Sequence, residues 1–234
     1  ASHAVTGGGN YCAGGTGVHV GLDGSAVSTW YQLYKGSAMV GSPMAGTGSS
    51  LDFGLQTATG VYTVMANSTS TTCASGMTGS VTVGTNALPV AYIISGGGNY
   101  CNGGTGVDIS LGGSQTGVNY QLYNGGTMVG SAMTGTGSAL DFGMQTAAGS
   151  YMIVAADGST LCTNSMTGTA NVGVNPLPVT YSVTGGGNYC SGSTGVHVML
   201  SGSGVGTTYS LRKDGIAVSG PVTGTGLGLD FGPQ

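Results

Sequence analysis

The sequence predicts an all-β protein made of tandem immunoglobulin-like antiparallel β-sandwich domains. Three observations predict this fold: a constant internal period, short segments in which apolar and polar residues alternate, and glycine-rich turns between those segments. Gly accounts for 50 of the 234 residues, and no segment sustains the apolar period of a helix. The repeat is considered first because it sets the domain boundaries.

The hexapeptide GGGNYC occurs three times, ending at Cys12, Cys101 and Cys190, with a spacing of 89 residues each time. The tetrapeptide LDFG keeps the same spacing. We therefore expect an immunoglobulin-like repeat at 1–89, a second at 90–178, and a truncated third at 179–234. The third repeat stops at Gln234, which aligns with Gln145, so we expect the chain to be an internal piece of a longer protein.

Within the first repeat, alternating segments predict strands at 17–22, 29–35, 38–42, 50–54, 60–67 and 79–84. The repeats themselves indicate which face is buried. Tyr31 and Leu33 recur in all three repeats, whereas Trp30 and its equivalents vary. Invariant apolar residues at alternate positions are typical of a half-buried strand, so Trp30, Gln32 and Tyr34 are expected to face outward.

Six or seven short strands in about 90 residues predict a sandwich of two sheets. The motif GxY, at Gly60–Tyr62 and Gly149–Tyr151, predicts a tyrosine corner at the start of the penultimate strand. The chain departs from an antibody domain because its second strand contains no cysteine, and because Trp30 occurs only once.

Composition excludes several classes of function. Only three residues are Lys or Arg, so no basic face can neutralise the phosphates of a nucleic acid. No apolar run is long enough to span a membrane. No recurring nucleophile–base pair, carboxylate dyad or metal cluster is present, which predicts neither enzyme activity nor a cofactor. His19 and His197 align with Asp108 and are read as outward strand residues, while Asp52 and its equivalents in LDFG are read as turn residues rather than calcium ligands.

The five cysteines leave two pairings open. Cys12–Cys73 and Cys101–Cys162 would each close a loop within one repeat, and we favour this arrangement because most secreted domains close their own bridges. The alternative is an inter-domain bond from Cys12 to Cys162, since stacked domains bring opposite ends together. The partner of Cys190 would lie beyond the end of the sequence. Paired cysteines in small repeated domains predict an extracellular location.

The order GGGNYC…GTGVHV…YQLY…GTGSSLDFG…TATGVYTVMA…C…GSVTV…NALPV resembles the immunoglobulin-like tandem repeats of giant Bacteroidetes-type cell-surface adhesins. This family includes the gliding-motility adhesins and other type IX secreted repeat proteins. The resemblance extends over the whole chain. It implies an extracellular stalk or adhesive filament, and it brings no catalytic residues.

Three functions follow from the sequence. The first is a structural stalk, stiffened by the short linkers Leu88–Pro89 and Leu177–Pro178, whose partners are the neighbouring repeats of the same chain. The second is a self-assembling extracellular fibre of like chains, because net charge is low and no Lys or Pro is evident at strand edges. The third is a module that binds surface glycans through Trp30, Tyr34 and Tyr123.

Overall fold

The computed structural model describes residues 2–71 and 73–234. By packing, the chain divides into two compact units, Ala1–Gly98 with Gly106–Gly173, and Asn99–Thr105 with Val174–Gln234. The described residues form strands, turns and irregular segments, and no helix is assigned among them. The all-β, immunoglobulin-like fold predicted from the sequence is therefore confirmed.

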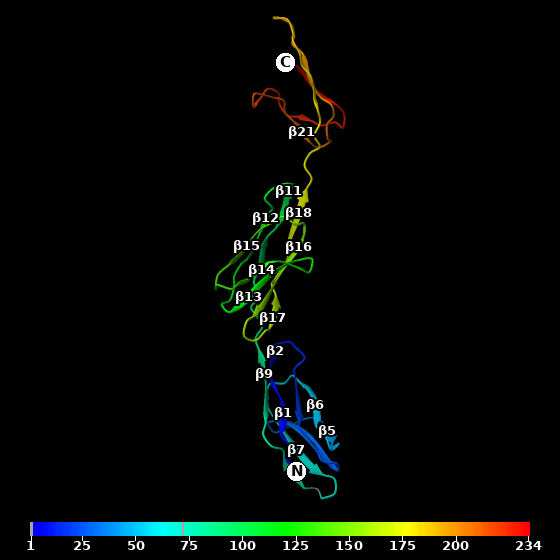
Figure 1. Cartoon of the computed structure of the whole chain (residues 1–234), viewed down its shortest axis with the longest axis vertical. Coiled ribbons are helices and arrows are strands. Elements are labelled where there is room, and N and C mark those ends of the chain that lie inside the picture. The colour runs from blue at the N-terminus through cyan, green and yellow to red at the C-terminus, as the bar shows by residue number, and fades with distance from the viewer. Residues whose placement is uncertain (1, 72) are drawn as a thin grey trace. The chain divides into compact units, whose positions relative to one another are not determined.

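Repeat one forms two sheets that face each other. Its strands are β1 (Val5–Gly7), β2 (Gly9–Cys12), β3 (Val18–Leu22), β4 (Thr29–Lys35), β5 (Ala38–Ala45), β6 (Leu51–Gln56), β7 (Gly60–Ser68), β8 (Ala74–Gly76) and β9 (Val81–Asn86). The smaller sheet has the order β1–β3–β6, and the larger has the order β2–β9–β7–β4–β5, with β8 added at the end of β7 (Figure 1). Neighbouring strands are antiparallel, except that β2 runs parallel to β9.

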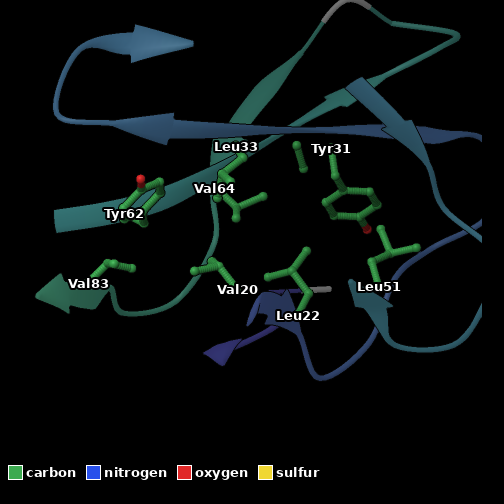
Figure 2. Close-up of a cluster of buried hydrophobic side chains, with 9 residues drawn as sticks. Val20, Leu22, Tyr31, Leu33, Leu51, Tyr62, Val64 and Val83 are labelled. Carbon is green, nitrogen blue, oxygen red and sulfur yellow. The ribbon is translucent and has the colours of Figure 1, made fainter. Parts of the chain in front are cut away.

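The core lies between these two sheets. Figure 2 shows Val20 and Leu22 of β3 and Leu51 of β6 facing side chains that come from the larger sheet. The buried residues of the larger sheet are Tyr31 and Leu33 of β4, Tyr62, Val64 and Ala66 of β7, and Val83 of β9. Alternate residues of each strand thus enter the core, as the invariant Tyr31 and Leu33 predict.

Gln32 lies on the outward face of β4, as predicted, but it is only 4% exposed. β4 pairs with β7 without a register shift, so Gln32 alternates with the core residues Tyr31 and Leu33. The register between β4 and β5 shifts between Tyr31 and Leu33, and the Gln32 amide donates to the carbonyl oxygens of Leu33 and Val40, both at 2.9 Å. The bulge in β5 therefore covers Gln32 and accepts its hydrogen bond.

The three glycines of GGGNYC carry the chain from one sheet to the other. β1 ends in the smaller sheet at Gly7, and β2 begins in the larger sheet at Gly9. Gly7, Gly8 and Gly9 have φ of 86°, 71° and 113°, which side chains rarely tolerate. A Cβ atom on Gly7 would also collide with the backbone carbonyl oxygen of His19. The hexapeptide makes the same crossing in repeat two, where β10 ends at Gly96 and β11 begins at Gly98.

Repeat two has the same topology. Its strands are β10 (Ile94–Gly96), β11 (Gly98–Cys101), β12 (Val107–Leu111), β13 (Val118–Asn124), β14 (Thr127–Thr134), β15 (Leu140–Gln145), β16 (Gly149–Asp157), β17 (Thr163–Ser165) and β18 (Ala170–Asn175). They form sheets of order β10–β12–β15 and β11–β18–β16–β13–β14, with β17 on β16. Tyr120, Leu122 and Tyr151 take the core positions of Tyr31, Leu33 and Tyr62.

Repeat three forms a sheet of β19 (Val183–Gly185), β20 (His197–Leu200) and β25 (Leu229–Pro233). Two short pairs accompany it: β21 (Thr208–Tyr209) with β24 (Val222–Thr223), and β22 (Arg212–Lys213) with β23 (Ile216–Ala217). Among the described residues, β21 pairs only with β24. Tyr209 and Leu211, the equivalents of Tyr120 and Leu122, are only half-buried.

Candidate functional site

A disulfide joins repeat one to repeat two. Cys12, the last residue of β2, is bonded to Cys162, which lies between β16 and β17, with the two Cα atoms 5.5 Å apart. Cys162 is fully buried. The bond lies within the first compact unit and closes a sequence separation of 150 residues.

The pairing favoured from the sequence, Cys12–Cys73 with Cys101–Cys162, is not the pairing in the structure. Cys73, Cys101 and Cys190 are free and exposed. The bond instead corresponds to the inter-domain alternative. The reason is found in the register of the larger sheet.

Cys12 and Cys73 lie at opposite ends of that sheet. Cys12 is opposite Asn86 of β9. Asn86 lies three residues after Val83, which pairs with Gly60, the first residue of β7. Cys73 immediately precedes Ala74, which is opposite Asn67 near the end of β7. Ten residues of extended strand separate these two levels by about 30 Å. A disulfide requires Cα atoms roughly 4–7 Å apart, so this pair cannot close without unfolding the sheet.

We call the end of a repeat that carries Cys73 or Cys162 the hairpin end: residues 68–71 and 73–75 in repeat one, and 157–164 in repeat two. We call the end that carries Cys12 or Cys101 the glycine-turn end, residues 9–15 and 98–104. The observed bond joins the glycine-turn end of repeat one to the hairpin end of repeat two.

Asp157 shapes the hairpin that presents Cys162. Its Oδ1 accepts hydrogen bonds from the Ser159 hydroxyl at 2.7 Å, the Thr160 amide at 2.8 Å and the Ser159 amide at 2.9 Å. These donors stabilise the carboxylate, led by the Ser159 hydroxyl, and hold the pKa of Asp157 well below its usual range. The hairpin also contains Leu161 at a φ of 59°, a strained value for a branched side chain.

Two side chains of repeat two, one in the hairpin end and one in the loop before β13, hold the incoming linker. The Asn164 amide donates to the Pro89 carbonyl oxygen at 2.7 Å, and the Val90 amide donates to the Gln115 side-chain oxygen at 2.6 Å. Pro89 is buried. The linker and the disulfide therefore fix the same end of repeat two.

The corresponding end of repeat one is an open pocket of about 350 Å³. Cys73, Tyr31, Ala66 and Met77 contribute to its lining. Ser68 occupies the position of Asp157 there, and Cys73 is exposed whereas Cys162 is buried.

Trp30, Tyr34 and Tyr123 are the aromatic residues predicted to bind a surface. Trp30 and Tyr34 lie on the same face of β4, where Trp30 is 46% exposed and Tyr34 is half-buried. Met39, opposite Tyr34 on β5, is 70% exposed. Tyr123 is half-buried at the position equivalent to Tyr34 in repeat two, where Asn119 replaces Trp30. An exposed apolar patch of this composition is present on repeat one only.

The histidines of the strand pattern pair with the aspartates of LDFG. His19 Nδ1 lies 2.7 Å from Asp52 Oδ2, and His197 Nδ1 lies 2.7 Å from Asp230 Oδ2. The Gly232 amide and then His197 hold the pKa of Asp230 below its usual range. In repeat two the same positions carry two carboxyl groups. Partial loss of water contact raises the pKa of Asp108, and a hydrogen bond and like charge from Asp141 raise it further.

The aspartates of LDFG also act as turn residues, as predicted. Oδ1 of Asp52, Asp141 and Asp230 accepts a hydrogen bond from the amide of the glycine two residues later, at 2.8, 2.6 and 2.8 Å. Among residues 2–71 and 73–234, no group of three or more His, Cys, Asp or Glu side chains could hold a metal ion. In the same part of the chain, no helix is long and apolar enough to cross a membrane.

The predicted tyrosine corners are confirmed. The buried Tyr62 hydroxyl donates to the Ala58 carbonyl oxygen at 2.7 Å, and the Tyr151 hydroxyl donates to the Ala147 carbonyl oxygen at 2.8 Å. Each bond ties the loop before β7 or β16 to the core of its own repeat. The corners therefore stiffen the loops at the glycine-turn end.

Sequence reasoning missed the residues that build the hairpin end of repeat two. Asp157, Gln115 and Asn164 align with Ser68, Ala26 and Ser75 in repeat one, so no repeated pattern draws attention to them. The available signal was the segment Asp157-Gly-Ser-Thr before Cys162, because Asp followed by such residues is typical of a side-chain-capped turn. Alignment of the repeats highlights recurring residues, so it does not reveal a residue that has a structural role in one repeat only.

No protein-family model matches this sequence, and no curated protein matches it. Among solved structures, the chain is similar to murine CEACAM1b at 13% identity, over 67% of this chain and 92% of that chain, with a TM-score of 0.32. It is similar to the fibronectin(III)-like modules of Clostridium thermocellum CbhA at 13% identity, over 73% and 95%, with a TM-score of 0.37. It is similar to the FN1–FN3 domains of chicken CNTN1 at 11% identity, over 93% and 84%, with a TM-score of 0.27. The class of protein rests on the topology described above: a tandem array of immunoglobulin-like sandwiches with a disulfide between repeats.

Proposed function

We propose that this chain is a non-enzymatic structural segment, a stalk or filament section, of a large extracellular bacterial adhesin. The single observation that carries the proposal is the Cys12–Cys162 bond, which joins consecutive repeats rather than locking one of them. A bond between repeats restrains the hinge at the Leu88–Pro89 linker. Such stiffness suits a stalk segment, whose role is to hold another domain of the adhesin away from the cell surface.

The bond also bypasses most of the chain under tension. A force that enters at the N-terminus reaches Cys12, crosses to Cys162 and continues from there. The residues between the two cysteines carry no load while the bond is intact. Strands β3 to β16 of repeats one and two are thereby shielded from the load, which favours a load-bearing role.

The surface composition supports the same role. Charged residues make up only 4% of the chain, and the formal net charge is −4. Such a surface attracts few partners by long-range electrostatics and changes little with salt. The disulfide is in keeping with an oxidising, extracellular location.

Sedimentation velocity across micromolar concentrations tests the proposal. A stalk segment is expected to remain a monomer whose sedimentation coefficient does not change with concentration. Growth into larger species would contradict it and favour the self-assembling fibre. The edge strand β5 contains Pro43, contrary to the expectation that strand edges carry no proline, and this residue disfavours edge pairing in repeat one.

Binding to a glycan surface is the second candidate, because Trp30 is exposed beside Tyr34 and Met39. Aromatic faces of this kind stack on sugar rings. The test is a glycan array with the chain and with Trp30→Ala, using Val61→Ala as a matched exposed-residue control. Binding that is saturable and lost only in Trp30→Ala would support this candidate. Equal binding by both variants would exclude the Trp30 site.

A further inference from the structure

The hairpin end of repeat one and the glycine-turn end of repeat two are built like the two halves of the observed bridge. Cys101 is equivalent to Cys12, and Cys73 is equivalent to Cys162. The two bonded cysteines thus have two free equivalents, one at each end of the pair of repeats.

The glycine turn of Cys101 has the same backbone as that of Cys12. The residue after each cysteine donates its amide to the last residue of the neighbouring strand: Ala13 to Asn86 at 2.9 Å, and Asn102 to Asn175 at 2.8 Å. The glycine three residues after each cysteine then donates to that cysteine's carbonyl oxygen at 2.9 Å in both turns. Cys101 is therefore presented on the same support that presents Cys12.

The receiving end is equivalent as well. In repeat two, Cys162 and Met166 are 0% and 5% exposed where repeat one and its linker are attached. In repeat one the equivalent Cys73 is exposed, and Met77 is half-buried. Both residues line the pocket of about 350 Å³. The pocket and the thiol are two separate signs that this end is shaped to receive something.

We infer that the hairpin end of repeat one is a docking site for the glycine turn of a repeat placed before it in the same polypeptide, closed by a disulfide between Cys73 and the cysteine of that turn. Cys101 is the donor half of the same joint toward a repeat that follows. The array is then a ladder of overlapping covalent loops, each spanning 150 residues as the observed one does.

The contact differs from the observed bridge in one respect. Ala26 and Ser75 replace Gln115 and Asn164, the two residues that hold the linker in repeat two. The linker into repeat one therefore lacks those two hydrogen bonds. The disulfide and the pocket therefore contribute a larger share of the contact at this joint than at the joint between repeats one and two.

The bond forms by thiol–disulfide exchange with a low-molecular-weight disulfide such as oxidised glutathione. The thiolate of the cysteine in the preceding repeat's glycine turn, the equivalent of Cys12 and Cys101, attacks one glutathione sulfur and releases a glutathione thiolate, leaving a mixed disulfide. The Cys73 thiolate then attacks the sulfur of that turn cysteine and releases the second glutathione. Two protein thiols are oxidised, one glutathione disulfide is reduced to two thiols, and the thiol protons pass to the released glutathione.

The test is a longer chain in the natural register: a copy of residues 1–178 fused directly ahead of the full 234-residue chain. Residue 178 ends a repeat, so the fusion keeps the period, and Cys101 of the leading copy stands 150 residues before Cys73 of the full chain. After exposure to oxidised glutathione, free thiols are counted with a maleimide and the bridges are mapped by peptic digestion. The unfused chain is treated in parallel.

The fusion has nine cysteines, five in the full chain and four in the leading copy. We expect three free thiols, the same number as in the chain alone, because the new Cys101–Cys73 bond consumes one cysteine from each copy. Cys73→Ser in the full copy is the matched control and is expected to give four. The Cys12–Cys162 bridge of each copy reports that the fusion has folded.

Five free thiols with both Cys12–Cys162 bridges intact would overturn the inference. A covalent dimer of the unfused chain through Cys73 would also overturn it, because the docking site would then accept a second copy rather than a preceding repeat. The test measures thiol pairing only. A result against the ladder would therefore leave the proposed stalk in place, and self-association would count against the stalk without touching the thiol count.

Discussion

Mechanical extension offers the most informative test of the Cys12–Cys162 bond. The perturbation is Cys12→Ser, and the matched control is Cys73→Ser, which removes a cysteine that is already free. While the bond is intact, the residues between Cys12 and Cys162 cannot contribute to the extended length of a chain pulled from its two ends. Removing the bond releases a sequence separation of 150 residues.

The magnitude follows from backbone dimensions. A fully extended chain spans at most roughly 3.3–3.6 Å per residue, so Cys12→Ser should lengthen the fully stretched chain by about 500 Å. On the chain-entropy treatment, loss of a loop of this size also costs about 5 kcal/mol of stability. That is a large share of the stability of a small domain, so unfolding of repeats one and two should also need less force.

Single-molecule force spectroscopy measures both effects. The oxidised chain and Cys73→Ser are expected to show no extension step from the residues between Cys12 and Cys162, and the reduced chain is expected to match Cys12→Ser. A step of about 300 Å in the oxidised chain, the length of one whole repeat, would refute the reasoning. A gain of only about 200 Å in Cys12→Ser would instead indicate a loop closed within repeat one.

Three further outcomes follow from side-chain contacts. Tyr62→Phe should destabilise repeat one by about 1 kcal/mol in denaturant unfolding, because the part-buried hydrogen bond from the Tyr62 hydroxyl to the Ala58 carbonyl oxygen is lost, while the partly exposed Tyr34→Phe should cost little. Asp108→His should stabilise repeat two by less than about 1 kcal/mol, because it replaces repulsion from Asp141 with the His–Asp pair of the other repeats. The resulting increase in Tm should be larger near pH 5.5 than near pH 8, because an imidazole is charged at the lower pH. An equal or opposite effect of pH on the Tm increase would contradict the pairing. Asp157→Ser should lower the Tm at neutral pH. Because the folded-state pKa of Asp157 is depressed, its contribution is present above the usual Asp pKa of about 4 and is lost as the pH falls, so the Tm difference from the parent chain should shrink in acid.

The sequence was sufficient to predict the class of fold, because a sandwich core depends on alternation and the repeats display that alternation three times. Tyr31, Leu33 and Tyr62 are buried as their invariance predicts. The GGGNYC segment lies outside the strands that alternation predicts, yet Gly9–Cys12 pairs as β2. The reason is that a parallel strand next to β9 is a long-range contact that no local pattern encodes.

The disulfide partner was not predictable by the same reasoning. The expectation that a secreted domain closes its own bridge favours Cys12–Cys73 and ignores where strands end. The outcome depends on register: the level of Cys12 against Asn86 and of Ala74 against Asn67 places the two cysteines at opposite ends of one sheet. A bulge in β5 likewise covers Gln32 on the outward face of β4, which a two-residue period cannot anticipate.

The most direct test of a covalent link between consecutive repeats is a non-reducing peptide map of the purified chain. The chain contains only three Lys or Arg residues, so trypsin leaves the cysteines on fragments too large to distinguish the pairings, and peptic digestion in acid is preferable because it also prevents disulfide exchange. The account predicts a peptide pair that joins Cys12 to Cys162, with Cys73, Cys101 and Cys190 recovered as alkylated thiols. Peptide pairs that join Cys12 to Cys73 and Cys101 to Cys162 would contradict it, because each repeat would then close on itself and nothing covalent beyond the backbone would link repeat one to repeat two.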